Sequence, residues 1–211
     1  MAGSSKKRKQ SSHRPKARKL GIIAEDNNDI AVIDELTRKF IKETQFSISP
    51  FIGRGCGKLR RKCKSWAGIL LQKGCEHLII VHDLDRNDEL SLREELEAKI
   101  KDLGFKKSIV LIPTEELEAW LLTDANAIKT VFNMKCLPKV PRHPEKVQSP
   151  KEYLGQLVRN NAKAQYLNTV HNQRIARELC VSSLDKCPSF STLPDFLLSV
   201  FPQKAQVART T

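Results

Sequence analysis

Three acidic residues follow apolar runs at positions where they could hold a metal ion. Glu25 comes directly after the run at residues 20–24, and Asp83 and Asp85 lie at the end of the run that begins at Glu76. Because residues two apart in an extended chain point the same way, the Asp83 and Asp85 side chains can converge. Hard oxygen donors without His or Cys favour Mg²⁺ or Mn²⁺ over zinc, and such ions activate water for attack on a phosphodiester. The sequence therefore predicts a catalytic metal site formed by these three carboxylates.

Turn formation explains the same acids more simply. Asp and Asn often follow strands because their side chains stabilise turns, so a lone Asp-x-Asp motif is weak support for a site. Acids after two separate buried strands are stronger support, because a folded protein avoids gathering like charges without a counterion. The residues alone leave metal binding and turn formation open, and the same holds for Asp26 and Asp88 as accessory ligands.

The acids can meet only if the strands before them belong to one sheet. Apolar runs predict four strands, at residues 20–24, 46–52, 76–83 and 108–112. The third run is unbroken, which is typical of a strand buried on both faces, and Pro50 favours an edge position for the second. The segments between the strands repeat apolar residues at helical steps. This alternation predicts an α/β fold with a Rossmann-like parallel sheet, helices on both faces and ligands at the carboxyl ends of the strands.

A further acid follows the fourth predicted strand. Thr114 can cap a helix that begins at Glu115 and Glu116, and these two acids then complement the positive end of the helix. Glu118 lies further along this helix, beside the apolar Trp120, so the helix is expected to be partly buried. Because a buried carboxylate needs a partner, Glu118 is predicted to be an additional metal ligand.

Basic residues gather in and after a glycine-rich loop at residues 53–58. Arg54 and Lys58 flank glycines that let a ligand approach the backbone, and Arg60 and Arg61 begin the helix predicted for residues 59–73. We expect these four basic residues to contact nucleic-acid phosphates. An ordinary turn and a solvated helix face explain them equally well.

Charge and composition divide the chain into parts. The net charge is +13, and residues 1–19 contain many Lys and Arg but no acid, which suits either a phosphate-binding arm or a solubilising tail. Ser149, Pro150 and Glu152 together predict the start of a late helix. The predicted parts are a disordered basic tail at 1–19, the α/β domain at 20–132, a helical C-terminal extension at 133–203 and a disordered tail at 204–211.

Cysteine spacing and hydropathy indicate the compartment. The six cysteines include no Cys-x-x-Cys pair, so free thiols in a reducing environment are expected rather than a zinc site. No apolar run is long enough to span a membrane, and no apolar stretch follows the basic N-terminus as in a secretory signal. We therefore expect a cytoplasmic protein without a membrane partner.

The acidic signature resembles that of a known superfamily. Glu25 after a first strand and Asp83-Leu84-Asp85 after a later one are similar to the TOPRIM domain of topoisomerases, primases and overcoming-lysogenization-defect nucleases. Within it, the chain resembles a group of small bacterial TOPRIM-like proteins over about residues 19–201. The segments that carry this closer resemblance are Ala24-Glu25, His82 to Asp85, Leu117 to Leu122, Pro150-Lys151 and Cys187 to Phe190.

The resemblance implies metal-dependent phosphodiester chemistry. It assigns Asp83 and Asp85 as metal ligands and Glu25 as a ligand or general acid/base, with Mg²⁺ or Mn²⁺ as the cofactor. It also implies a role in phage defence beside an ABC-type ATPase partner.

Three functions remain open at this stage. The first is a nuclease that cuts DNA or RNA. The second is a receiver-like phosphoacceptor module with Asp83 as the acceptor, although its spacing from Glu25 is long for a receiver and Asp85 then has no role. The third is a nucleic-acid-binding adaptor without catalytic activity. The sequence does not decide the oligomeric state, and a homo-oligomer fits it as well as a monomer.

Overall fold

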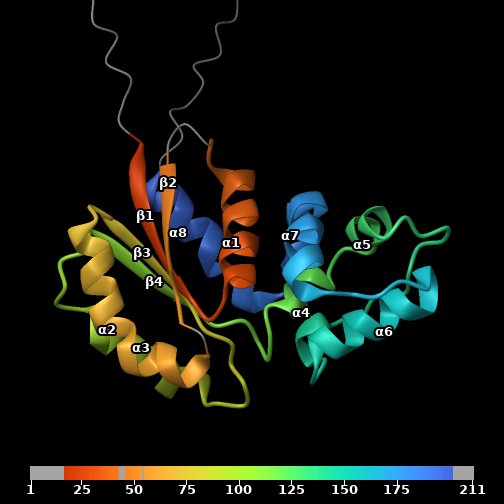
Figure 1. The fold of residues 1–211 in the computed structure, drawn as a ribbon, viewed down its shortest axis with the longest axis horizontal. Coiled ribbons are helices and arrows are strands. Elements are labelled where there is room, and N and C mark those ends of the chain that lie inside the picture. The colour runs from red at the N-terminus through yellow and green to blue at the C-terminus, as the bar shows by residue number, and fades with distance from the viewer. Residues whose placement is uncertain (1–16, 43–45, 54, 202–211) are drawn as a thin grey trace, which may run out of the picture.

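A computed structural model describes residues 17–42, 46–53 and 55–201, and these form a parallel sheet with helices around it (Figure 1). Arg54, residues 1–16 of the predicted basic tail and all of the predicted tail at 204–211 lie outside the described residues. Arg18 and Lys19, predicted to belong to the basic tail, instead begin the first strand. The sheet has four strands in the order β2-β1-β3-β4, all parallel. The strands are β1 (Arg18–Ala24), β2 (Phe46–Ile52), β3 (His77–Val81) and β4 (Lys107–Leu111). The predicted α/β class with a parallel sheet is confirmed.

The order of the strands places the acidic residues at one edge of the sheet. All five residues of β3 are buried, as its unbroken apolar run predicts, and β2, which contains Pro50, is an edge strand. Strands β1 and β3 are direct neighbours, with Ile23 opposite Ile80. Glu25 and Asp83 therefore leave adjacent strands at the same end of the sheet.

Helices cover both faces of the sheet, as predicted (Figure 1). Alternate strand residues point to opposite faces, so Ile22 and Ile79 join one core and Ile23 and Ile80 join the other. The first core contains α1 (Asn27–Phe40) and α8 (Thr192–Val200), and the second contains α2 (Cys56–Gln72) and α3 (Glu89–Ile100). The remaining elements are α4 (Glu118–Leu121), α5 (Ala125–Val131), η2 (Pro144–Lys146), α6 (Pro150–Ala162), α7 (Asn168–Glu178), η3 (Val181–Lys186) and η4 (Pro188–Phe190).

The C-terminal helices share a core with the sheet. Leu197 of α8 is fully buried in the same cluster as Leu36 of α1 and Ile79 of β3. Trp120 is also fully buried, and its Nε1 donates a hydrogen bond to Ser189 Oγ at 2.8 Å. The predicted extension at 133–203 is helical, but its last helix completes one face of the predicted α/β domain.

Two local predictions are wrong, and a third holds in part. The helix predicted to begin at Glu115 starts instead at Glu118, because Glu115 has a left-handed backbone with φ 60° and the Asp83 carboxylate binds the Leu117 N–H. The late helix does begin at Pro150, but the Ser149 side chain does not cap it. Helix α2 begins at Cys56 rather than at residue 59.

Other features concern the cysteines and the membrane. The five cysteines whose side chains are described are free thiols, as expected. Among the described residues, no helix has both the length and the apolar character that crossing a membrane requires.

Candidate functional site

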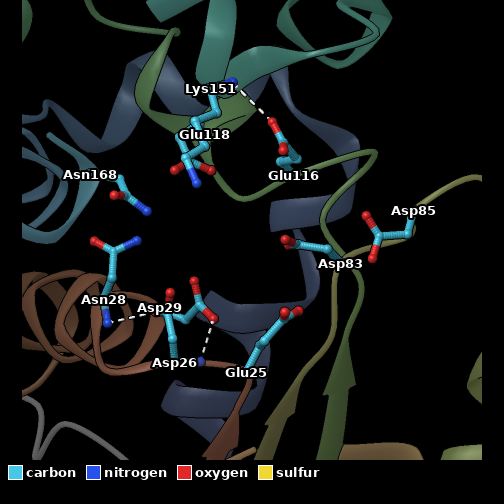
Figure 2. Close-up of a pocket in the computed structure, with 10 residues that line it drawn as sticks. All are labelled: Glu25, Asp26, Asn28, Asp29, Asp83, Asp85, Glu116, Glu118, Lys151 and Asn168. Atoms are coloured by element: carbon cyan, nitrogen blue, oxygen red, sulfur yellow. Dashed lines mark hydrogen bonds between the residues drawn. The ribbon is translucent and has the colours of Figure 1, made fainter. Parts of the chain in front are cut away.

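A pocket lies beyond the carboxyl ends of β1 and β3, and acidic side chains line most of it. Its volume is about 160 Å³. The predicted ligands Glu25, Asp83, Asp85 and Glu118 all line it, although they come from three separate segments of the chain (Figure 2). The other lining residues are Asp26, Asn28, Asp29, Glu116, Lys151 and Asn168. Seven carboxylates and one basic side chain therefore share this space.

A sharp turn, rather than strand alternation, directs Asp85 to the pocket. Strand β3 ends at Val81, and both Asp85 and Arg86 have left-handed backbones, with φ 45° and 61°. The Leu84 N–H donates to the Pro113 carbonyl oxygen at 3.1 Å, which ties this turn to the segment after β4. The prediction that Asp85 lies beside Asp83 thus agrees with the structure, but the reason given for it was wrong.

Asp83 lies between the acids of the other segments. Its Oδ1 accepts a hydrogen bond from the Leu117 backbone N–H at 3.1 Å. Burial and the neighbouring carboxylates, first Asp29 and then Glu118, raise the pKa of Asp83 well above its usual value. A bound cation would offset this repulsion, because it favours the ionised form of nearby carboxylates.

Asp29 is a pocket residue that the sequence analysis did not identify. Burial, and next the charge of Asp26, raise the pKa of Asp29 to about 7. Asp26 caps α1 by accepting hydrogen bonds from the N–H groups of Asn28 and Asp29, and Asp29 Oδ2 accepts one from the Asp26 N–H. This reciprocal capping box was readable from the Asp-x-x-Asp spacing, but it points to a helix start and not to a pocket.

Glu118 is buried, with 5% of its surface exposed, and two side chains hold it. Asn172 Nδ2 donates a hydrogen bond to Glu118 Oε1 at 2.9 Å, and the Tyr166 hydroxyl donates to the same oxygen at 3.3 Å. Tyr166 also bonds Asn172 Oδ1, so the three side chains form one network. Burial and the Glu118 charge raise the pKa of Tyr166. Within the described residues both donors reach Oε1, which leaves Oε2 for the pocket.

Glu116 caps a distant helix instead of its own. Its Oε2 accepts a hydrogen bond from the backbone N–H of Lys151 at 2.9 Å, at the start of α6 (Figure 2). Burial raises the pKa of Glu116. This contact caps α6 in place of the Ser149 side chain, which makes no cap hydrogen bond, and attaches α6 to the pocket.

Oxygen donors and crowded negative charge fit a hard divalent cation. Carboxylate oxygens are preferred ligands of Mg²⁺ and Mn²⁺, and an ion among them would relieve the repulsion that raises the pKa values of Asp29 and Asp83. Among the described residues, no group of three or more His, Cys, Asp or Glu side chains is arranged so that it could hold a metal ion. Cation binding therefore requires some of these side chains to move closer together.

The predicted phosphate-binding residues that the structure describes, Lys58, Arg60 and Arg61, do not line this pocket. Arg54 lies outside the described residues, while Lys58 and Arg61 are exposed on α2. Arg60 Nε donates to Glu95 Oε2 at 3.0 Å, so this guanidinium is engaged within the fold. Of the two proposed accessory ligands, Asp26 lines the pocket, whereas Asp88 caps α3 by accepting a hydrogen bond from the Ser91 N–H at 2.8 Å.

The fold and the pocket together define the class of protein to which this chain belongs. The chain is an α/β protein with an acidic pocket at the carboxyl ends of a four-stranded parallel sheet. It belongs to the family described as "Domain of unknown function (DUF4276)", which residues 24–198 match, and this match includes every residue that lines the pocket. No curated protein and no solved structure matches the chain.

Proposed function

We propose that this protein hydrolyses phosphodiester bonds of DNA or RNA with Mg²⁺ or Mn²⁺ bound in the acidic pocket. The observation that carries the proposal is the convergence of Glu25, Asp83, Asp85 and Glu118 at the carboxyl edge of the sheet. The net charge of +13 supports a polyanionic substrate, because the acidic pocket lies in an otherwise strongly basic chain. The similarity to TOPRIM domains supports the same chemistry.

The four predicted ligands and Lys151 each have a role in this proposal. Asp83, Asp85 and Glu118 hold the cation, and Glu25 serves as a ligand or as a general acid/base. When bound, the cation supplies charge stabilisation at the reacting phosphate and lowers the pKa of a water molecule. Lys151 places positive charge at the edge of the pocket, where a phosphate can approach. Lys58, Arg61 and Arg54 are proposed to bind more distant phosphates.

A cleavage assay tests the proposal. Plasmid, single-stranded DNA and tRNA are each incubated with the protein in Mg²⁺, Mn²⁺ or EDTA, with and without a candidate ABC-type ATPase partner. We expect cation-dependent cleavage that falls at least about a hundredfold in Asp83→Asn and Asp85→Asn, the order of loss seen when one electrostatic group is removed from an active site. Asp185→Asn, an exposed acid outside the pocket, is the matched control.

Two results would reject the nuclease. Cleavage that survives in Asp83→Asn and Asp85→Asn removes the pocket from the reaction. Nucleic-acid binding without cleavage under every condition, with the ATPase present, favours the adaptor instead.

The strand order supports a receiver-like phosphoacceptor as the second candidate. The order β2-β1-β3-β4 is also that of the first four strands of flavodoxin-like receiver folds. Asp83 would then accept a phosphoryl group. Incubation with acetyl phosphate distinguishes the two, because only a receiver gains a phosphoryl group on Asp83 that is absent in Asp83→Asn.

A further inference from the structure

Asn28 is a largely buried polar residue of the pocket that has no role in the cation site proposed above. Only 7% of its surface is exposed, and within the described residues its side-chain amide makes no hydrogen bond. Its backbone N–H donates to Asp26 Oδ1 at 2.7 Å, which fixes the residue in the first turn of α1. The amide atoms are not fully enclosed, because Asn28 lines the pocket, so its donor and acceptor are available to a ligand that enters the pocket.

The Asn28 amide points into the pocket on the side away from the acids of β3. Figure 2 shows it facing the Asn168 amide across one side of the pocket, with Asp83 and Asp85 on the other side. A second cavity, of about 340 Å³, adjoins the pocket here, and Asn28 lines both. Thr169 and Gln173 of α7 line this second cavity.

The start of α7 adds positive potential at the same place. No side chain caps α7 in the part of the chain that the structure describes, and its first residues, Asn168 and Thr169, line the two cavities. The first N–H groups of a helix have no partners within the helix and carry a partial positive charge, so they attract anions. At the start of α1, by contrast, the Asp26 carboxylate already satisfies two of these groups.

We propose that Asn28, together with Asn168 and the start of α7, forms a phosphate subsite beside the acidic pocket. It would bind a phosphate of the nucleic-acid backbone next to the one that is cut, an assignment that rests on the proposed hydrolase function. The Asn28 amide donates its N–H groups to a phosphate oxygen, and the strand continues along the second cavity between α1 and α7. Asp26 lines both cavities as well, but its Oδ1 accepts hydrogen bonds from the Asn28 and Asp29 N–H groups, so the donors of the subsite come from Asn28, Asn168 and the start of α7.

The variant Asn28→Asp tests the subsite because it keeps the shape and replaces the donor with a negative charge. Binding is measured by fluorescence anisotropy of a labelled DNA strand with phosphorothioate linkages, in Ca²⁺. We expect about tenfold weaker DNA binding, as for the loss of a hydrogen bond to a charged group, while the Mn²⁺ affinity measured by calorimetry does not fall. Asn168→Asp should weaken DNA binding in the same direction.

The chain supplies a matched control in α5. Asn126 occupies the same position after the capping residue Asp124, and its N–H donates to Asp124 Oδ1 at 2.9 Å, but it lies outside both cavities. Asn126→Asp should therefore leave DNA binding unchanged. Thermal melts of all three variants verify that each folds.

The remaining results of these binding experiments decide between a phosphate subsite and other roles for Asn28. Unchanged DNA binding in Asn28→Asp overturns the subsite, as does tighter Mn²⁺ binding alone, which would make Asn28 a cation ligand. Competition between inorganic phosphate and DNA in the wild type that is weakened in Asn28→Asp supports the subsite, because both ligands present phosphate oxygens. If the wild type never cleaves but Asn28→Asp still loses DNA binding, the subsite stands and the hydrolase proposal fails.

Discussion

Asp29 is a carboxylate of the pocket whose pKa lies near neutral pH. Its pKa is raised from 3.8 to about 7, mainly by burial and then by Asp26. A carboxyl group whose pKa is higher in the folded than in the unfolded state destabilises the fold once the pH exceeds the unfolded-state pKa. The penalty in the free energy of unfolding grows until the pH passes the folded-state pKa. The penalty from Asp29 is therefore absent below about pH 4 and complete above about pH 7.

Asp29→Asn should accordingly stabilise the protein in EDTA at pH 8. The expected gain is on the order of 2 kcal/mol in the free energy of unfolding, and it should vanish at pH 4. Urea unfolding at both pH values measures it. Asp34→Asn on the same helix is the control, because its carboxylate pairs with Arg38 at 2.9 Å and its loss should not stabilise. An equal effect at both pH values would contradict the electrostatic explanation.

Asn172 holds Glu118 from α7, and its removal should leave a buried carboxylate short of a donor. Asn172→Leu keeps the branched shape, at a larger volume, and removes the 2.9 Å hydrogen bond to Glu118 Oε1. We expect a loss of about 2 to 3 kcal/mol in the free energy of unfolding, because that bond reaches a charged group. Glu118→Gln in the same background should recover part of the loss in urea unfolding, since it removes the charge. No recovery would mean that Asn172 acts through packing alone.

At the scale of elements, local sequence patterns predicted the strands, whereas contacts between distant segments determine where other elements begin. The strands were predictable because each is a buried apolar run, and Pro50 correctly placed β2 at an edge. The conformation of the segment before Glu118 was not predictable from the sequence, because it depends on the hydrogen bond between Asp83 and the Leu117 N–H. Asp29 looked like a helix-capping residue because it is one, and only the fold brings it near the other acids.

Helix α8 should be as necessary to the sheet as α1. Leu197 is fully buried in the core that also contains Leu36, whereas its neighbour Leu198 is 45% exposed. Leu197→Ala should lower the free energy of unfolding by about 2 to 5 kcal/mol, as for other large-to-small core changes, in a single urea transition. Leu198→Ala, the control on the same helix, should change it by less than about 0.5 kcal/mol. A separate early transition in Leu197→Ala would show that the C-terminal helices unfold independently of the sheet.

Across the whole molecule, one pocket collects carboxylates from both halves of the chain. Glu25 and Asp83 leave neighbouring strands, while Glu118 is held by Tyr166 and Asn172 from the C-terminal half. The candidate ligands were readable from the sequence because each follows a predicted strand. The network around Glu118 was not readable, because more than 40 residues separate Glu118 from each of its two partners. Binding in the pocket is therefore coupled to the free energy of unfolding of the complete fold.

That coupling predicts that a divalent cation stabilises the entire protein. A ligand that binds only the folded state adds about 2.7 kcal/mol to the free energy of unfolding at a hundred times its Kd. Titration with Mn²⁺ should raise the melting temperature, EDTA should reverse the rise, and binding should release protons because the pKa values of Asp29 and Asp83 are raised. Asp83→Asn should abolish the rise and Asp185→Asn should preserve it, with NaCl of equal ionic strength as the salt control. A rise that persists in Asp83→Asn would place the cation elsewhere and leave the crowded carboxylates without a counterion.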